Sequence, residues 1–156
     1  SRRSRRSSAS LKHHAASVLV MPFDGAPEDQ GALRTLMLPI GGAPKAKPME
    51  KLGVVEILKR TKDAFQGFIW VGREPNCDVV IPFANVSKLQ AQFVPKGNGF
   101  DLVDVGSTNG TFVEGQRLAR NHPITLVNGK KIVFGTLEVR FLTPDGFYEE
   151  LGERLK

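Results

Sequence analysis

Residues 100–113 read Phe-Asp-Leu-Val-Asp-Val-Gly-Ser-Thr-Asn-Gly-Thr-Phe-Val. Two short runs with β character, Phe100–Val103 and Thr111–Val113, flank a segment that contains Gly106 and Gly110. The Asn109-Gly110 pair is a strong signal for a hairpin turn. We therefore expect two strands joined by a tight loop at this point in the chain.

The same rhythm of short β runs and turn residues continues on both sides of this stretch. Several of the runs alternate apolar and polar residues, as half-buried strands do. No long helical pattern interrupts the series between residues 52 and 141, so the sequence predicts an all-β sandwich. The expected strands of this region are Val54–Leu58, Phe68–Val71, Val79–Ile81, Ala91–Val94, Phe100–Val103, Thr111–Val113, Ile124–Leu126, Lys131–Phe134 and Leu137–Phe141.

The N-terminal third divides into two parts by composition. Residues 1–17 are basic, Ser-rich and without period, which predicts a disordered arm. Residues 18–50 form an extension with possible strands at Val18–Phe23 and Leu33–Ile40, followed by a Pro/Gly-rich linker. We place the main domain at residues 51–143.

The last residues, 144–156, predict a short helix. Asp145 is positioned to cap it, because an aspartate side chain accepts hydrogen bonds from the first free N–H groups of a helix. Phe147, Leu151 and Leu155 then fall on one face. We expect this apolar stripe to dock onto the sandwich.

The composition of the chain excludes several classes of protein. Its 156 residues are 40 % hydrophobic and carry a net charge of +6, and no apolar run approaches the roughly 20 residues of a membrane span. The single cysteine, Cys77, has no cysteine to pair with and no metal-ligand spacing, which favours a cytoplasmic protein. His13, His14 and His122 have no neighbours that suggest a catalytic pair or a metal site. The sequence therefore predicts no enzyme activity, catalytic residue, metal or cofactor.

Three expected loop segments contain the polar side chains that could bind a ligand. They combine an arginine fork, a lysine, hydroxyl groups and a side-chain amide with glycines that permit tight turns. Such groups suit a phosphate ester and the peptide backbone beside it, since a guanidinium donates two directed hydrogen bonds to phosphate oxygens. The segments are Val71–Glu74, Asn85–Ala91 and Asp104–Thr111.

The ordered set of Gly72-Arg73, then Ser87-Lys88-x-Gln90-Ala91, then residues 106–111 resembles the forkhead-associated (FHA) domain. The resemblance covers residues 52–142 and is specific because several motifs follow in the right order and spacing. It implies a β-sandwich of about eleven strands that recognises phosphothreonine with loops at one end. It also implies a role as an adaptor or regulator in Ser/Thr kinase signalling.

The resemblance also implies roles for single residues. Arg73, Ser87 and Lys88 are expected to hold the phosphate, Thr108 to line the phosphothreonine site, and Asn109 to grip the ligand backbone. Four further residues are expected to shape the loops: Gly72, Gln90, Gly106 and Gly110. The family usually has histidine at the position of Gln90, and we expect the glutamine to buttress the loops in its place, with its side chain pointing inward.

The partners expected are a threonine-phosphorylated protein and a Ser/Thr protein kinase in the same pathway, with no membrane contact. Two alternatives stay open at this point. One is a phosphate-independent interaction module on the same scaffold, which the Gln90 substitution motivates. The other is association with nucleic acid through the basic arm, a less favoured reading.

Overall fold

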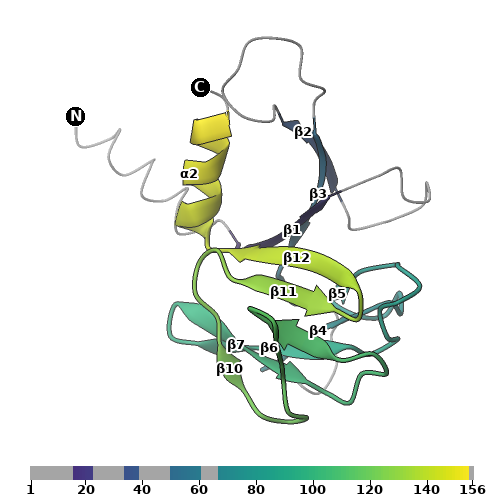
Figure 1. Ribbon diagram of the computed structural model, residues 1–156. Helices are drawn as coiled ribbons and strands as arrows, with labels where there is room; N and C mark the ends of the chain where they lie inside the picture. Colours follow the sequence, from purple (N-terminus) through teal and green to yellow (C-terminus); the bar gives the residue numbers. More distant parts are fainter. Residues whose placement is uncertain (1–15, 23–33, 39–49, 61–66, 155–156) are drawn as a thin grey trace.

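Two β-sheets and one helix make up the part of the chain that the computed structural model describes, which is residues 16–22, 34–38, 50–60 and 67–154 (Figure 1). The prediction of an all-β sandwich with a short C-terminal helix is confirmed, with twelve strands in the described residues. The elements are β1 (Val18–Pro22), β2 (Arg34–Leu38), β3 (Glu50–Glu56), β4 (Ile69–Gly72), β5 (Val79–Val80), β6 (Ala91–Lys96), β7 (Gly99–Asp104), β8 (Thr111–Val113), β9 (Gln116–Arg117), β10 (Ile124–Thr125), β11 (Lys131–Phe134), β12 (Leu137–Leu142) and α2 (Pro144–Arg154).

The strands are divided between a seven-stranded sheet, ordered β2-β3-β1-β12-β11-β8-β9, and a five-stranded sheet, ordered β10-β7-β6-β4-β5. All described neighbours pair antiparallel except β4 and β5, which are parallel. Strands β7 and β8 lie in different sheets, so residues 105–110 cross from one sheet to the other. The hairpin prediction for Asn109-Gly110 is therefore wrong, and only Gly110 of that pair has the positive φ that a type I′ turn needs at both positions.

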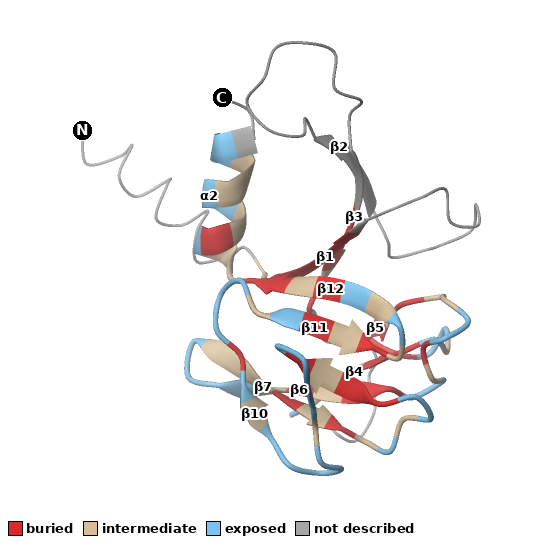
Figure 2. Ribbon diagram, viewed as in Figure 1, coloured by how far each residue is buried: buried red, intermediate tan, exposed pale blue. Residues whose placement is uncertain are grey.

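The core lies between the two sheets, where alternate residues of strands such as β4, β6 and β11 are buried. Figure 2 shows buried residues along the strands and exposed residues in the connecting loops. Phe93 on β6 meets the ring of Phe100 edge-on at 5.9 Å, and Phe100 meets Phe141 of β12 at 6.4 Å. Because Phe141 belongs to the other sheet, this chain of rings joins the two layers.

Strand β1 is apolar along its length because both of its faces are covered. Leu19 and Met21 belong to the main core, while Val18 and Val20 belong to a second apolar cluster. That second cluster is completed by Phe147 and by other apolar side chains of β3, β12 and α2. Residues 18–22 thus lie in the sheet between β3 and β12, although the sequence analysis assigned them to an extension.

Helix α2 packs one apolar stripe against the sandwich, as expected. Phe147 and Leu151 contact the cluster around Leu142, whereas Leu155 lies outside the described residues. The cap differs from the prediction. Thr143 precedes the helix and its hydroxyl accepts a hydrogen bond from the N–H of Gly146 at 3.1 Å, while Asp145 lies within the first turn. The described part of the chain contains no helix with the length and hydropathy needed to cross a bilayer.

Candidate phosphopeptide site

Three loops meet at the end of the sandwich where β4 and β7 finish and β6 begins. Antiparallel pairing places these strand ends side by side, so the loops that leave Gly72 and Asp104 lie next to the loop that enters Ala91. The turn between β11 and β12 joins them, because the N–H of Gly135 donates to the carbonyl of Gly110 at 2.9 Å. The three polar segments found in the sequence are thus neighbours in space.

The first two segments are held together by backbone hydrogen bonds. The N–H of Arg73 donates to the carbonyl of Ser87 at 3.0 Å, and the N–H of Glu74 donates to that of Lys88 at 3.3 Å. Gly72 permits this approach, since a β-carbon there would lie 2.2 Å from the Lys88 carbonyl oxygen. The pairing places the two cationic residues of the predicted site, Arg73 and Lys88, on adjoining loops.

Both cationic side chains are available to a ligand. Arg73 is exposed, and no described carboxylate forms an ion pair with it. The side chain of Lys88 is 72 % exposed, and its Nζ atom lies 4.0 Å from a carboxylate oxygen of Glu74. An exposed pair at that distance contributes at most about 1 kcal/mol, so Lys88 can turn from Glu74 toward a bound anion at small cost.

Ser87 connects the second segment to the third. Its Oγ atom accepts a hydrogen bond from the N–H of Thr108 at 2.9 Å. The hydroxyl hydrogen of Ser87 then remains to be donated, and a phosphate oxygen is a strong acceptor. Thr108 and Asn109 are both exposed beside this hydroxyl, on the same loop.

Asn109 and Asn85 make a second link between these loops. The side-chain amide of Asn109 donates to the carbonyl of Asn85 at 3.3 Å, and the side-chain amide of Asn85 donates to the hydroxyl of Thr136 at 2.7 Å. These two bonds leave the side-chain carbonyl oxygen of Asn109 as an acceptor. An amide that donates and accepts in this way matches the hydrogen-bonding groups of a peptide backbone.

Gln90 is the buttress beneath the loops, and its inward orientation is confirmed. Its side chain is fully buried. The Oε1 atom accepts from the N–H of Ser87 at 2.9 Å, and the Nε2 atom donates to the carbonyl of Gly110 and the hydroxyl of Thr111, each at 2.9 Å. One amide therefore ties the Ser87 segment to the Gly110 segment, with all three bonds made inside the protein.

Asp104 organises the third segment from within. One carboxylate oxygen accepts from the N–H groups of Gly106 and Ser107 at 2.7 and 3.1 Å, and the other accepts from the hydroxyls of Ser107 and Thr111 at 2.5 and 2.6 Å. Burial on its own raises the pKa of Asp104, but the hydrogen bonds from these hydroxyl and N–H groups outweigh it, so the pKa lies below the ordinary aspartate value. The carboxylate is thus charged and fully occupied at neutral pH.

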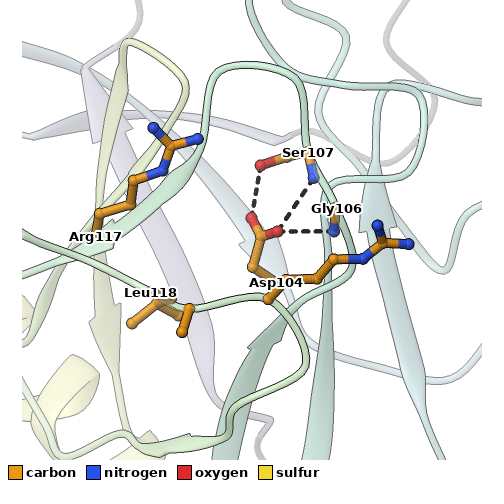
Figure 3. A pocket seen from close by; sticks show the side chains of 7 residues that line it. Asp104, Gly106, Ser107, Arg117 and Leu118 are labelled. Atoms are coloured by element: carbon orange, nitrogen blue, oxygen red, sulfur yellow. Dashed lines mark hydrogen bonds between the residues drawn. The ribbon is translucent and has the colours of Figure 1, made fainter.

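Two glycines of this loop have positive φ and lie against arginine side chains. Gly106 has φ +99° and Gly110 has φ +93°, so each adopts a conformation that other residues rarely do. A β-carbon on Gly106 would lie 3.0 Å from the guanidinium carbon of Arg120, and one on Gly110 would lie 3.0 Å from Nε of Arg117. The arginines border a groove of about 540 Å³, part of which is drawn in Figure 3, lined by Asp104, Gly106, Ser107, Arg117, Leu118, Ala119 and Arg120.

The structure thus brings all the predicted site residues to one end of the sandwich. It also adds residues to which the sequence analysis gave no role. Asp104 carried a usable signal, since an aspartate two residues before a glycine N–H is the pattern of an Asx turn. Thr111 and Thr136 carried none, because their contacts with Gln90 and Asn85 join distant segments. In the ranges described, no group of three or more His, Cys, Asp or Glu side chains could hold a metal ion.

Comparisons with known proteins identify the family of this chain. The model of the FHA domain family matches residues 69–135. The oxoglutarate dehydrogenase inhibitor of Corynebacterium efficiens is 32 % identical over 111 residues, which is 65 % of this chain and 76 % of that protein. The chain belongs to the FHA domain family.

One further relative and one solved structure are also similar to this chain. The glycogen accumulation regulator GarA of Mycobacterium tuberculosis is 35 % identical over 78 residues, covering 50 % of this chain and 46 % of GarA. The chain therefore spans less than half the length of this relative. The N-terminal FHA domain of Rad53p from S. cerevisiae, solved with a phosphothreonine peptide, is 21 % identical with a TM-score of 0.50, covering 77 % of this chain and 99 % of that domain. This last likeness concerns the fold.

Proposed function

We propose that this protein binds a phosphothreonine-containing segment of a partner protein through the loops that carry Arg73, Ser87, Lys88, Thr108 and Asn109. The observation that carries the proposal is the bond from the Thr108 N–H to the Ser87 hydroxyl. This bond leaves the Ser87 hydroxyl hydrogen to be donated, and the exposed side chains of Arg73, Lys88 and Asn109 come from the same group of loops. That set of groups matches a phosphate ester followed by a peptide backbone.

Each predicted residue has a distinct part in this proposal. Arg73 and Lys88 supply positive charge, and Arg73 also supplies two directed N–H groups. Ser87 donates its hydroxyl hydrogen to a phosphate oxygen. Thr108 lines the pocket for the threonine methyl group, and Asn109 pairs with the ligand main chain.

The relatives support a regulatory role. GarA is named as a regulator of glycogen accumulation, and the Corynebacterium protein as an inhibitor of oxoglutarate dehydrogenase. Both names describe regulatory proteins. For this chain we infer a non-catalytic adaptor or regulator whose ligand is made by a Ser/Thr protein kinase. We place it in the cytoplasm, where such kinases have ATP.

The Gln90 geometry weakens the case for a phosphate-independent module. That alternative arose because this chain has glutamine where the family usually has histidine. The glutamine makes three hydrogen bonds that hold the Ser87 and Gly110 segments together. The loops are therefore supported for ligand binding with this residue in place. The basic arm that motivated a nucleic-acid role falls at residues 1–17, of which residues 1–15 lie outside the described part.

The test is a titration of the whole chain with three peptides that differ only at one residue, which is phosphothreonine, phosphoserine or threonine. We expect the phosphothreonine peptide to bind most tightly. The phosphoserine peptide loses the burial of one methyl group, worth about 0.8 kcal/mol or roughly a fourfold change in affinity. The unphosphorylated peptide is expected to show no measurable binding. Equal affinity for the phosphorylated and unphosphorylated peptides would refute the proposal.

A further inference from the structure

The groove bordered by Arg117 and Arg120 has no part in the phosphothreonine site proposed above. Both arginines are exposed. Neither guanidinium forms an ion pair with a carboxylate of the described residues. The groove therefore holds two positive charges that the described protein does not neutralise.

The one carboxylate in the lining does not serve these arginines. The oxygens of Asp104 are occupied by four donors, which are the hydroxyls and N–H groups of Gly106, Ser107 and Thr111. Figure 3 shows the Asp104 side chain turned toward Gly106 and Ser107, with Arg117 set apart from it. The guanidinium groups keep their N–H donors for a group that comes from outside.

Both arginine side chains lie against the loop that carries the proposed site. Arg120 lies over Gly106 and Arg117 lies beside Gly110, and a β-carbon at either glycine would crowd the guanidinium. Arg117 is also the register partner of Phe112 in the β8–β9 hairpin. The two glycines therefore have a second role beyond permitting positive φ, because they make room for the two cations against the loop.

The groove and the proposed phosphate site share one wall. Ser107 lines the groove, and the next residue, Thr108, donates to Ser87 in the proposed site. Because Ser107 and Thr108 are consecutive, their Cα atoms are about 3.8 Å apart, and the groove begins directly beside the proposed phosphate site. A ligand residue close to the phosphothreonine can therefore reach the groove. The volume of about 540 Å³ admits a side chain with an acidic or phosphoryl head.

We propose that this groove is a second anion-binding subsite, in which Arg117 and Arg120 hold an acidic group of the same phosphothreonine peptide a few residues from the phosphothreonine. The group is a carboxylate or a second phosphoryl group. Guanidinium forks bind either in a bidentate manner, with phosphoryl favoured by its greater charge. This inference rests on the proposed function and gives the site a preference for acidic ligands.

The experiment compares three peptides of one sequence at fixed ionic strength: phosphothreonine with neutral neighbours, the same peptide with aspartates at the neighbouring positions, and the same peptide with phosphoserine there. Moving the acidic residue along the peptide locates the position that reaches the groove. We expect the acidic peptides to bind the parent protein about five- to tenfold more tightly than the neutral one. No preference in the parent would overturn the inference.

Two variants test whether the preference comes from the groove. Arg117→Gln with Arg120→Gln is expected to remove the preference and to leave affinity for the neutral peptide within about twofold, since these residues are outside the phosphate site. Ala119→Glu keeps both arginines and places a carboxylate beside them, since Ala119 is exposed in the lining. It is expected to remove the preference as well. A preference that survives in either folded variant would overturn the inference.

A charge-matched control separates the groove from the overall charge of the protein. Lys130→Gln with Lys131→Gln also removes two positive charges, and it is expected to retain the preference. Loss of the preference in this control would mean a general electrostatic effect and would overturn the inference. Failure of the neutral phosphothreonine peptide to bind the parent would instead contradict the proposed function, so the two ideas fail by different results.

Discussion

Gly72 and Lys88 approach so closely that no side chain fits between them, since a β-carbon on Gly72 would lie 2.2 Å from the Lys88 carbonyl oxygen. The obstacle is backbone on both sides, so it cannot be relieved by rotating a side chain. The same carbonyl accepts hydrogen bonds from the Glu74 N–H and the Cys77 thiol, at 3.3 and 3.5 Å. Burial raises the pKa of that thiol to about 11, so it stays protonated and able to donate.

Gly72→Ala is therefore expected to push the Arg73 and Lys88 segments apart. The cost of such overpacking is about 1–3 kcal/mol in the free energy of unfolding, and phosphopeptide affinity should fall with it. Urea denaturation and peptide titration measure the two effects. Gly67→Ala is the matched control, because a β-carbon there has nothing within 4 Å. Equal stability of the two variants would contradict the steric argument.

Gln90→Leu is expected to lower both stability and phosphopeptide affinity. The change leaves the Ser87 N–H without its acceptor, and it removes one hydrogen bond each from the Gly110 carbonyl and the Thr111 hydroxyl, which keep Gly135 and Asp104 as partners. An unpaired buried group costs about 1–3 kcal/mol and a lost hydrogen bond about 0.5–1.5 kcal/mol, so we expect a loss of about 2–4 kcal/mol after partial relaxation.

Gln90→His tests whether the buttress is a matter of hydrogen bonding. The imidazole can also donate and accept, so this variant is expected to keep most of the stability and to match or exceed the parent in affinity. Thermal melting and peptide titration of both variants beside the parent give the comparison. Parent-like behaviour of Gln90→Leu in both assays would show that Gln90 has no buttressing role.

The variants Arg73→Ala and Lys88→Ala compare what directed hydrogen bonds and positive charge alone contribute to phosphopeptide affinity. Arg73 presents a planar fork that can hold two phosphate oxygens, whereas Lys88 presents a mobile ammonium group that is 72 % exposed. We expect Arg73→Ala to reduce phosphopeptide affinity at least about tenfold and Lys88→Ala to reduce it less. Isothermal titration of the two folded variants decides the order, and a larger loss for Lys88→Ala would reverse these assignments.

The hydrogen bonds to Asp104 predict how stability depends on pH. Its pKa is lowered in the folded protein, so the folded state favours the charged carboxylate. That contribution is fully present above the unfolded pKa of about 4 and is lost as the pH falls through the folded value. The stability gap between the parent and Asp104→Asn should therefore be largest near pH 7 and should shrink below pH 4.

Urea denaturation of both proteins at pH 7 and at pH 3 measures this gap. Asp145→Asn is the control, since Asp145 is exposed in the first turn of α2 and its removal reports the general effect of one lost negative charge. A gap between the parent and Asp104→Asn that stays constant over this pH range would contradict the role given to the Asp104 carboxylate.

Some strands could be predicted from the sequence with both of their ends, and others were missed. Strands such as Thr111–Val113 and Lys131–Phe134 agree with the structure at both ends, because local alternation and turn residues define them. The short strand Gln116–Arg117 was missed, since two exposed polar residues carry no period. The course of residues 105–110 between the sheets was missed for a different reason: Asn109-Gly110 fits a hairpin locally, and only the pairing of β7 and β8 with distant strands excludes one.

The candidate site was proposed from residue type and order, and the inward position of Gln90 was predicted with it, while the other internal hydrogen bonds were not. Arg73 and Asn109 stand out because each lies beside a glycine, and Ser87 because it precedes Lys88 in a polar segment. The hydrogen bond from Asn85 to Thr136 and the one from Thr108 to Ser87 join residues that are 51 and 21 positions apart in the chain. Sequence order alone does not encode such contacts.

The position of β1 has a consequence for how the chain folds. Val18 pairs with Glu56 on one side and with Leu142 on the other, so β1 forms a bridge between strands made early and late in synthesis. The ribosome must complete β12 before that second edge is covered. Contacts of such long sequence separation slow folding, because the intervening loop must close before they form. Until then Val18, Leu19, Val20 and Met21 are an apolar strand edge that another nascent chain could join, so this region depends on rapid completion of the sheet.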